Sequence, residues 1–94
     1  MNSLEESILE AEMEMNILDL VINEVASTMD VPLSSLSTET ALKEIGMDSL
    51  QALQLLVALE QATKMQFEES DLKQFVTVQS IVDLLNDRSR KAAA

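Results

Sequence analysis

Apolar residues recur along the first third of the chain at alternating intervals of four and three. The positions are Leu4, Ile8, Ala11, Met15, Leu18, Ile22, Val25 and Met29. This spacing places them on one stripe of a helix. Ser3 can cap such a helix, with Glu6 reaching back to the cap, and Asn16 offers a rival start. The helix ends at Asp30-Val31-Pro32, because proline disfavours a helical residue before it.

Residues 32–43 lose the helical period and are rich in serine and threonine. Their apolar anchors are Leu33, Leu36 and Leu42. A loop of this length in a small domain needs to be pinned to the core, and Leu42 and Ile45 are suitable for that. The pattern predicts a long, structured first loop.

A second helix is predicted to begin at Asp48 or Ser49 and to run to about Lys64. Gly46 supplies a flexible backbone position before it. Asp48 can cap the free amides of the first turn, and Gln51 fits the third position of a capping box.

A short third helix follows, opening at Glu69 or Ser70 and ending near Gln74. Thr77 then caps a last helix that is expected to end before Asn86. Its inward-facing apolar positions are Val78, Ile81, Val82, Leu84 and Leu85, and we also expect Phe67 and Phe75 in the core. Four helices, the third of them short, make the fold class all-α.

Composition agrees with a single helical domain and narrows its chemistry. The 94 residues include one glycine, one proline and two phenylalanines, which favours helices over β structure. Seventeen acidic and six basic residues give a net charge of −11, which opposes binding to nucleic acid or to an anionic membrane. With neither an export signal nor a membrane-spanning segment, we expect a cytoplasmic protein.

The chain lacks histidine, cysteine, tyrosine and tryptophan, so we expect that it is not an enzyme. Its clustered carboxylates lack the alternating ligands and the glycine of a calcium loop, and no metal site is predicted. The remaining candidate is Ser49, at a junction of loop and helix. Spacing alone favours a helix N-cap for this serine. A competing interpretation is a non-covalent helical interaction module, in which the N-terminal helix binds a partner and Ser49 is only a cap.

The run Gly46-Met47-Asp48-Ser49-Leu50, with Ala41–Ile45 before it and Phe75–Val78 after it, resembles the acyl carrier protein family. The resemblance spans roughly residues 16–86. It implies a four-helix carrier bundle with a long loop between helices one and two. It also implies that a phosphopantetheinyl transferase moves 4′-phosphopantetheine from coenzyme A onto Ser49, and that Asp48 assists the transfer, although Asp48 can equally be only the cap.

The resemblance further implies a function. Such a carrier presents thioester-linked acyl groups to acyl-transferring and condensing enzymes of fatty acid, polyketide or related lipid biosynthesis. A peptidyl or aminoacyl carrier of a peptide-synthetase pathway is the alternative that the sequence does not separate from it. Glutamines stand on the second helix where the fatty-acid carriers have acids, which favours a dedicated carrier with less electrostatic partner recognition.

The second helix divides into two faces. Leu50, Leu53 and Val57 lie beside Ser49 and are predicted to bind partners, whereas Leu55, Leu56 and Leu59 suit the core. Glu60 and Glu68 are expected to add a weaker attraction for partners. The competing interpretation is that the row beside Ser49 is simply core.

The predicted organisation is an N-terminal helical extension over residues 1–15, a carrier domain over 16–87 and a mobile tail over 88–94. The extension either frays in solvent or serves as a docking or dimerising helix through Leu4, Ile8, Leu9 and Met15. We expect the protein to be a monomer.

Overall fold

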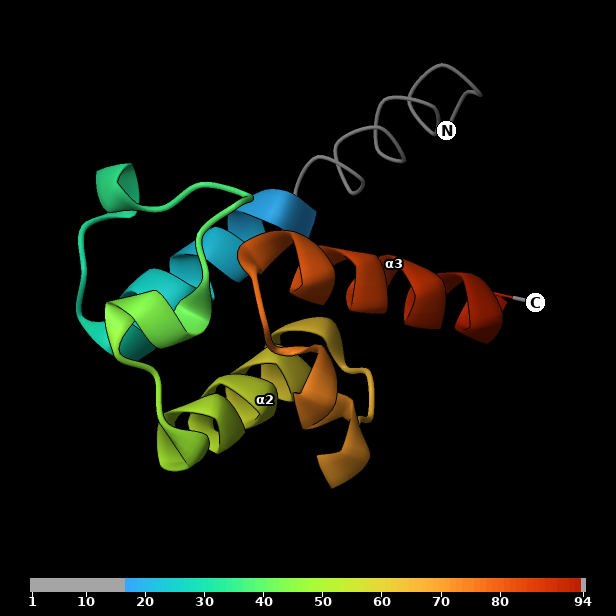
Figure 1. The fold of residues 1–94 in the computed structure, drawn as a ribbon. Helices are drawn as coiled ribbons and strands as arrows, with labels where there is room; N and C mark the ends of the chain where they lie inside the picture. Colours follow the sequence, from blue (N-terminus) through green and yellow to red (C-terminus); the bar gives the residue numbers. More distant parts are fainter. Residues whose placement is uncertain (1–16, 94) are drawn as a thin grey trace, which may run out of the picture.

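The computed structural model describes residues 17–93, and its elements are helical (Figure 1). Residues 17–29 are helical. The elements that follow are the 3₁₀ helices η1 (Leu33–Ser35) and η2 (Leu42–Ile45), α2 (Ser49–Thr63), the 3₁₀ helix η3 (Glu69–Gln74) and α3 (Val78–Ala93). The predicted extension over residues 1–15, its Ser3 cap and its docking role lie outside this range.

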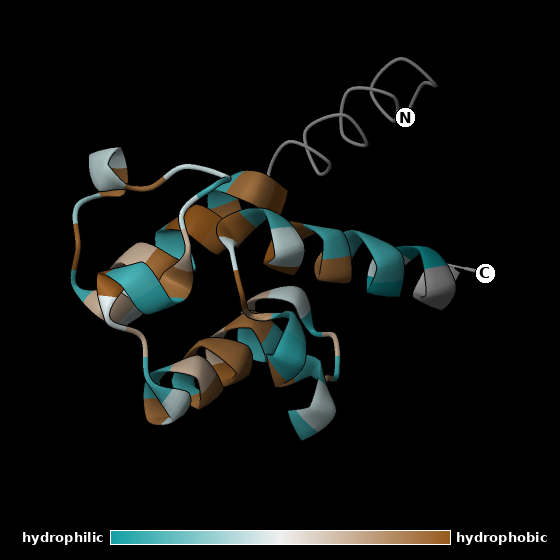
Figure 2. Cartoon of the chain, viewed as in Figure 1, coloured by the Kyte–Doolittle hydropathy of each residue, from teal (hydrophilic) through white to brown (hydrophobic). Residues whose placement is uncertain are grey.

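The helical segment 17–29, α2 and α3 enclose one apolar core (Figure 2). The buried apolar residues are Val21, Val25, Ala26, Leu42, Leu55, Leu56, Leu59, Phe67, Phe75, Val78, Ile81, Val82 and Leu85. The predicted core positions of α2 and α3 are therefore confirmed, with Leu84 only partly buried. None of the helices in the described range is long and apolar enough to cross a membrane.

The buried face of segment 17–29 is wider than its predicted stripe. Val21 and Ala26 are buried although they lie off that stripe, while Leu18 and Ile22 are only partly buried. A helix that packs against two neighbours buries a broader face than the narrow seam of a coiled coil. The four-three spacing thus located the helix but not the centre of its buried face.

The long loop is pinned by hydrogen bonds to the start of α3 as well as by apolar side chains. The Leu42 amide donates to the Val76 carbonyl at 2.9 Å, and the Gln79 amide donates to the Thr38 carbonyl at 2.9 Å. Leu42 is buried as predicted. The prediction that Leu33 anchors the loop is wrong. Its side chain is 51% exposed, and η1, to which it belongs, contains no buried residue.

The last helix continues past Asn86, where the sequence predicts its end, to Ala93. Arg88 on this continuation contacts Gln66, Phe67 and Asp71, so the folded domain includes residues beyond position 87. The domain boundary drawn after residue 87 lies inside α3. Helical spacing of apolar residues stops near Leu85, and the polar turns after it carry no such signal.

Gly46 turns the chain between η2 and α2 with a φ of 90°, in the left-handed region. A Cβ built there meets no atom within 4 Å, so the cost of a side chain is conformational. We expect Gly46→Ala to lower the free energy of unfolding by about 1 kcal/mol, and Gly46→Asn to lower it less, because asparagine tolerates this conformation better. Urea unfolding measures both values; equal stability of the Ala variant and the wild type would contradict the prediction.

Candidate functional site at the start of α2

The first turn of α2 is closed by a reciprocal pair of side chains. The backbone amide of Gln51 donates to Asp48 Oδ1 at 2.8 Å, and the backbone amide of Asp48 donates to the side-chain oxygen Oε1 of Gln51 at 3.1 Å. Asp48 is the N-cap residue and Ser49 is the first residue of the helix. The predicted capping box is confirmed, and the capping role suggested for Ser49 is wrong because Asp48 fills it.

Ser49 is exposed at this helix start. Within residues 17–93 its hydroxyl has no hydrogen-bond partner, and neither do the backbone amides of Ser49 and Leu50. Free amides and the positive end of the helix dipole favour an anion at such a position. A phosphodiester at Ser49 therefore fits the site, and the hydroxyl is open to an incoming enzyme.

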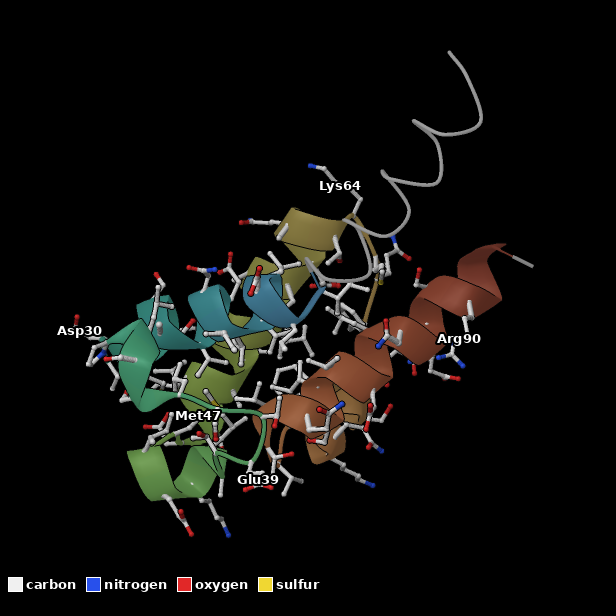
Figure 3. All side chains as sticks on the ribbon, turned by 90° about the horizontal axis from the view of Figure 1, so that it is seen from above. Asp30, Glu39, Met47, Lys64 and Arg90 are labelled. Carbon is white, nitrogen blue, oxygen red and sulfur yellow. The ribbon has the colours of Figure 1, made fainter. Side chains whose placement is uncertain are left out.

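A shallow hollow of about 270 Å³ lies beside Ser49. Its walls come from η2, the start of α2 and η3, and from the residues next to them. The lining residues are Leu42, Lys43, Met47, Asp48, Ser49, Ala52, Leu72 and Phe75. Met47, labelled in Figure 3, lies where the loop enters α2.

Sequence reasoning missed Met47, Ala52 and Leu72 as residues of this site. Ala52 lies one turn after Ser49, and helical spacing could have placed it on the same face. Leu72 belongs to η3 and follows Ser49 by 23 residues along the chain. No local pattern reports that proximity, because it depends on how η3 packs against α2.

The apolar row on α2 is exposed, as predicted. Leu50 is 63% exposed, Leu53 38% and Val57 42%, whereas Leu55, Leu56 and Leu59 are buried. The competing interpretation, that this row is core, is therefore wrong. Glu60 is the only charged residue in the sequence of α2, so the exposed row Leu50, Leu53 and Val57 carries no charge of its own.

The two predicted partner-binding glutamates do not gather at Ser49. Glu60 lies eleven residues along α2, about 16 Å along the helix axis. Its Oε2 accepts a hydrogen bond from the Phe67 amide at 3.0 Å, so it also fixes the chain after α2. Glu68 is exposed and precedes η3, where its amide donates to Asp71 Oδ2 at 2.9 Å.

Asp71 is the one carboxyl in residues 17–93 with a resolved change in pKa. Its pKa is lowered, first by the hydrogen bond from the Glu68 amide and then by Arg88, whose Nη2 lies 2.9 Å from Asp71 Oδ1; burial opposes both. A carboxyl with a lowered pKa stabilises the fold above its unfolded pKa of about 3.8. That stabilisation is lost as the pH falls through the lower folded value.

We therefore expect Asp71→Asn to be less stable than the wild type at pH 7. The gap should narrow as the pH falls below about 3.8, because the wild type loses its ionic contribution there while the variant has none. Urea unfolding of both proteins at several pH values measures the gap. A gap that stays constant from pH 7 to pH 2.5 would count against this role of Asp71.

Comparison with known proteins agrees with this geometry. Residues 19–85 match the family model described as a phosphopantetheine attachment site. The chain is 35% identical over 84 residues to acyl carrier protein 4, chloroplastic, of Arabidopsis thaliana, covering 89% of this chain and 59% of that protein. It is 34% identical over 59 residues to the acyl carrier protein of Onion yellows phytoplasma (strain OY-M), covering 62% of this chain and 78% of the other.

A solved structure shows the same fold. It is a free-standing peptidyl carrier protein from an uncharacterized secondary metabolic pathway of Acinetobacter baumannii, with a TM-score of 0.69 and 23% identity. The match covers 79% of this chain and 92% of the other. The predicted all-α carrier bundle is confirmed.

Proposed function

Because the chain belongs to the acyl carrier protein family, whose shared domain is a phosphopantetheine attachment site, we propose that Ser49 bears the arm. The observation that carries the proposal is the free, exposed hydroxyl of Ser49 beside two free amides at the start of α2. In this role the protein presents acyl groups as thioesters. The chemical steps belong to its partner enzymes.

Loading requires Ser49 to act as a nucleophile toward coenzyme A on a phosphopantetheinyl transferase. Ser49 Oγ forms a bond to the phosphorus next to the pantetheine as the nucleotide portion of coenzyme A leaves, and the hydroxyl proton passes to a base. The free amides of Ser49 and Leu50 would hold the phosphodiester oxygens by hydrogen bonds. The terminal thiol of the bound arm supplies the thioester chemistry, since the chain itself has no cysteine.

We assign two roles to the Asp48 carboxylate. Its Oδ1 caps α2 through the Gln51 amide, while its Oδ2 has no hydrogen-bond partner within residues 17–93. One carboxylate oxygen can therefore hold the helix start while the other assists the transfer onto Ser49. The cap and the assisting role are compatible.

The proposed docking surface for the transferase and for acyl-transferring and condensing enzymes is the row Leu50, Leu53 and Val57. These side chains are exposed beside the attachment serine, and apolar contact area there gives binding free energy when a partner covers it. Glu60 and Glu68 contribute a weaker attraction from farther along the surface.

The test of the attachment is the intact mass of the protein after incubation with coenzyme A and a broad-specificity transferase. We expect a gain of one phosphopantetheine, and fragmentation should place it on Ser49. A chain that keeps its unmodified mass with several transferases would overturn the proposal. Incubation of the loaded carrier with adenylating enzymes for fatty acids or for amino acids then separates an acyl carrier from a peptidyl carrier.

A further inference from the structure

Arg88, on the part of α3 that lies beyond the predicted helix end, joins three parts of the chain. Its Nη2 lies 2.9 Å from Asp71 Oδ1 and its Nη1 donates to the Gln66 carbonyl at 3.2 Å. The guanidinium carbon lies 5.5 Å from the centre of the Phe67 ring. One side chain therefore ties α3 to the chain after α2 and to η3.

Asp71 receives this contact while it also holds the start of η3. Its Oδ2 accepts from the Glu68 amide at 2.9 Å, and its Oδ1 faces Arg88. The Asp71 side chain is only 14% exposed and that of Arg88 31%, so this ion pair is less screened by water than a surface pair.

Asp71 holds the beginning of η3, and the Ser80 hydroxyl of α3 holds its end by donating to the Gln74 carbonyl. η3 is a six-residue 3₁₀ helix with no buried residue, and short 3₁₀ helices have weaker hydrogen-bond geometry than α-helices. Within it, Leu72 packs partly against the core. Tertiary contacts, more than its own hydrogen bonds, must therefore set the position of η3.

The position of η3 matters for the serine because this element forms one wall of the hollow. Leu72 follows Asp71 directly and lines the hollow together with Phe75, Met47, Ala52 and Ser49. A displacement of η3 relative to α3 therefore changes the surface next to Ser49.

We propose that Arg88 is a positioning residue for this hollow: by holding Asp71, it fixes η3 and with it the Leu72 wall beside Ser49. The inference concerns the unloaded chain and does not depend on whether Ser49 accepts an arm. It assigns a role at the site to a residue 39 positions from the serine along the chain.

The test compares Arg88→Gln with Arg90→Gln in the unloaded, full-length protein by NMR. Arg90, labelled in Figure 3, is exposed on the same helix, and its substitution removes the same charge. In Arg88→Gln we expect the methyl resonances of Leu72, Ala52 and Met47 to shift. The Phe75 amide, which bonds the Leu72 carbonyl at 3.0 Å, should exchange about tenfold faster, as the loss of a charge-assisted hydrogen bond predicts.

The Arg90→Gln control should keep the wild-type methyl shifts and exchange rates. Arg88→Lys should shift the same resonances less, because lysine can pair with Asp71 but lacks the planar fork that also reaches Gln66. If Arg88→Gln does not fold, Asp71→Asn decides, because its side-chain oxygen can still accept from the Glu68 amide while the ion pair with Arg88 is lost: displaced resonances at the hollow support the inference, and a wild-type spectrum overturns it. The inference is also overturned if Arg88→Gln keeps the wild-type methyl shifts, or if Arg90→Gln shifts these resonances as much as Arg88→Gln does. Amide exchange in Arg88→Gln that is accelerated equally throughout α2 and α3 overturns it as well.

Discussion

Ser49→Ala should remain folded and accept no phosphopantetheine. The serine is the first residue of α2, and its hydroxyl makes no hydrogen bond within residues 17–93. Because Asp48 and Gln51 hold the helix start, removal of the hydroxyl should change the free energy of unfolding by no more than about 0.5 kcal/mol. Loading should be lost completely, since the nucleophile is gone. Intact mass spectrometry and urea unfolding measure the two results.

Ser34→Ala is the matched control for this variant. Ser34 is also exposed and lies in η1, away from the start of α2. The control should load like the wild type. A Ser49→Ala chain that still gains one phosphopantetheine would show that another residue bears the arm, and a marked loss of stability in that variant would show that the hydroxyl has a structural role.

Leu53→Ala should impair transfer between the loaded carrier and an acyl enzyme more than Glu60→Gln. Fully covering an exposed leucine contributes about 1.5–3 kcal/mol, and because Leu53 is 38% exposed, covering it contributes about 0.6–1.1 kcal/mol, a loss of roughly threefold to sevenfold. An exposed charge contributes about 0–1 kcal/mol. Glutamine at position 60 can still accept the Phe67 amide hydrogen bond, so Glu60→Gln tests charge with little effect on the fold. The measurement is kcat/KM for acyl transfer.

Salt and thermal unfolding separate the possible causes of a defect in Leu53→Ala. Because α2 carries a single charge, raised salt should weaken transfer only modestly. Leu53 is 38% exposed and Leu55 is fully buried, so Leu55→Ala should destabilise the domain by about 2–5 kcal/mol and Leu53→Ala by less. Transfer abolished by moderate salt would show that charges govern docking. Unfolding of Leu53→Ala without a partner-specific defect would assign that residue to the core.

The sequence was sufficient for features that depend on neighbouring residues. The capping box of Asp48 and Gln51, the limits of α2 and the two faces of that helix all follow from positions within one or two helical turns of each other. The structure has each of them as predicted. The motif around Ser49 also identified the family, because its residue types and order are specific.

Tertiary structure alone decided how distant segments use these local elements. The last turns of α3 are polar, so periodicity could not show that Arg88 there binds Asp71, seventeen residues away. The hollow beside Ser49 likewise depends on the packing of η3 against α2. Local hydrogen bonds and helical spacing are encoded within a few residues, whereas such contacts exist only once the whole core has formed.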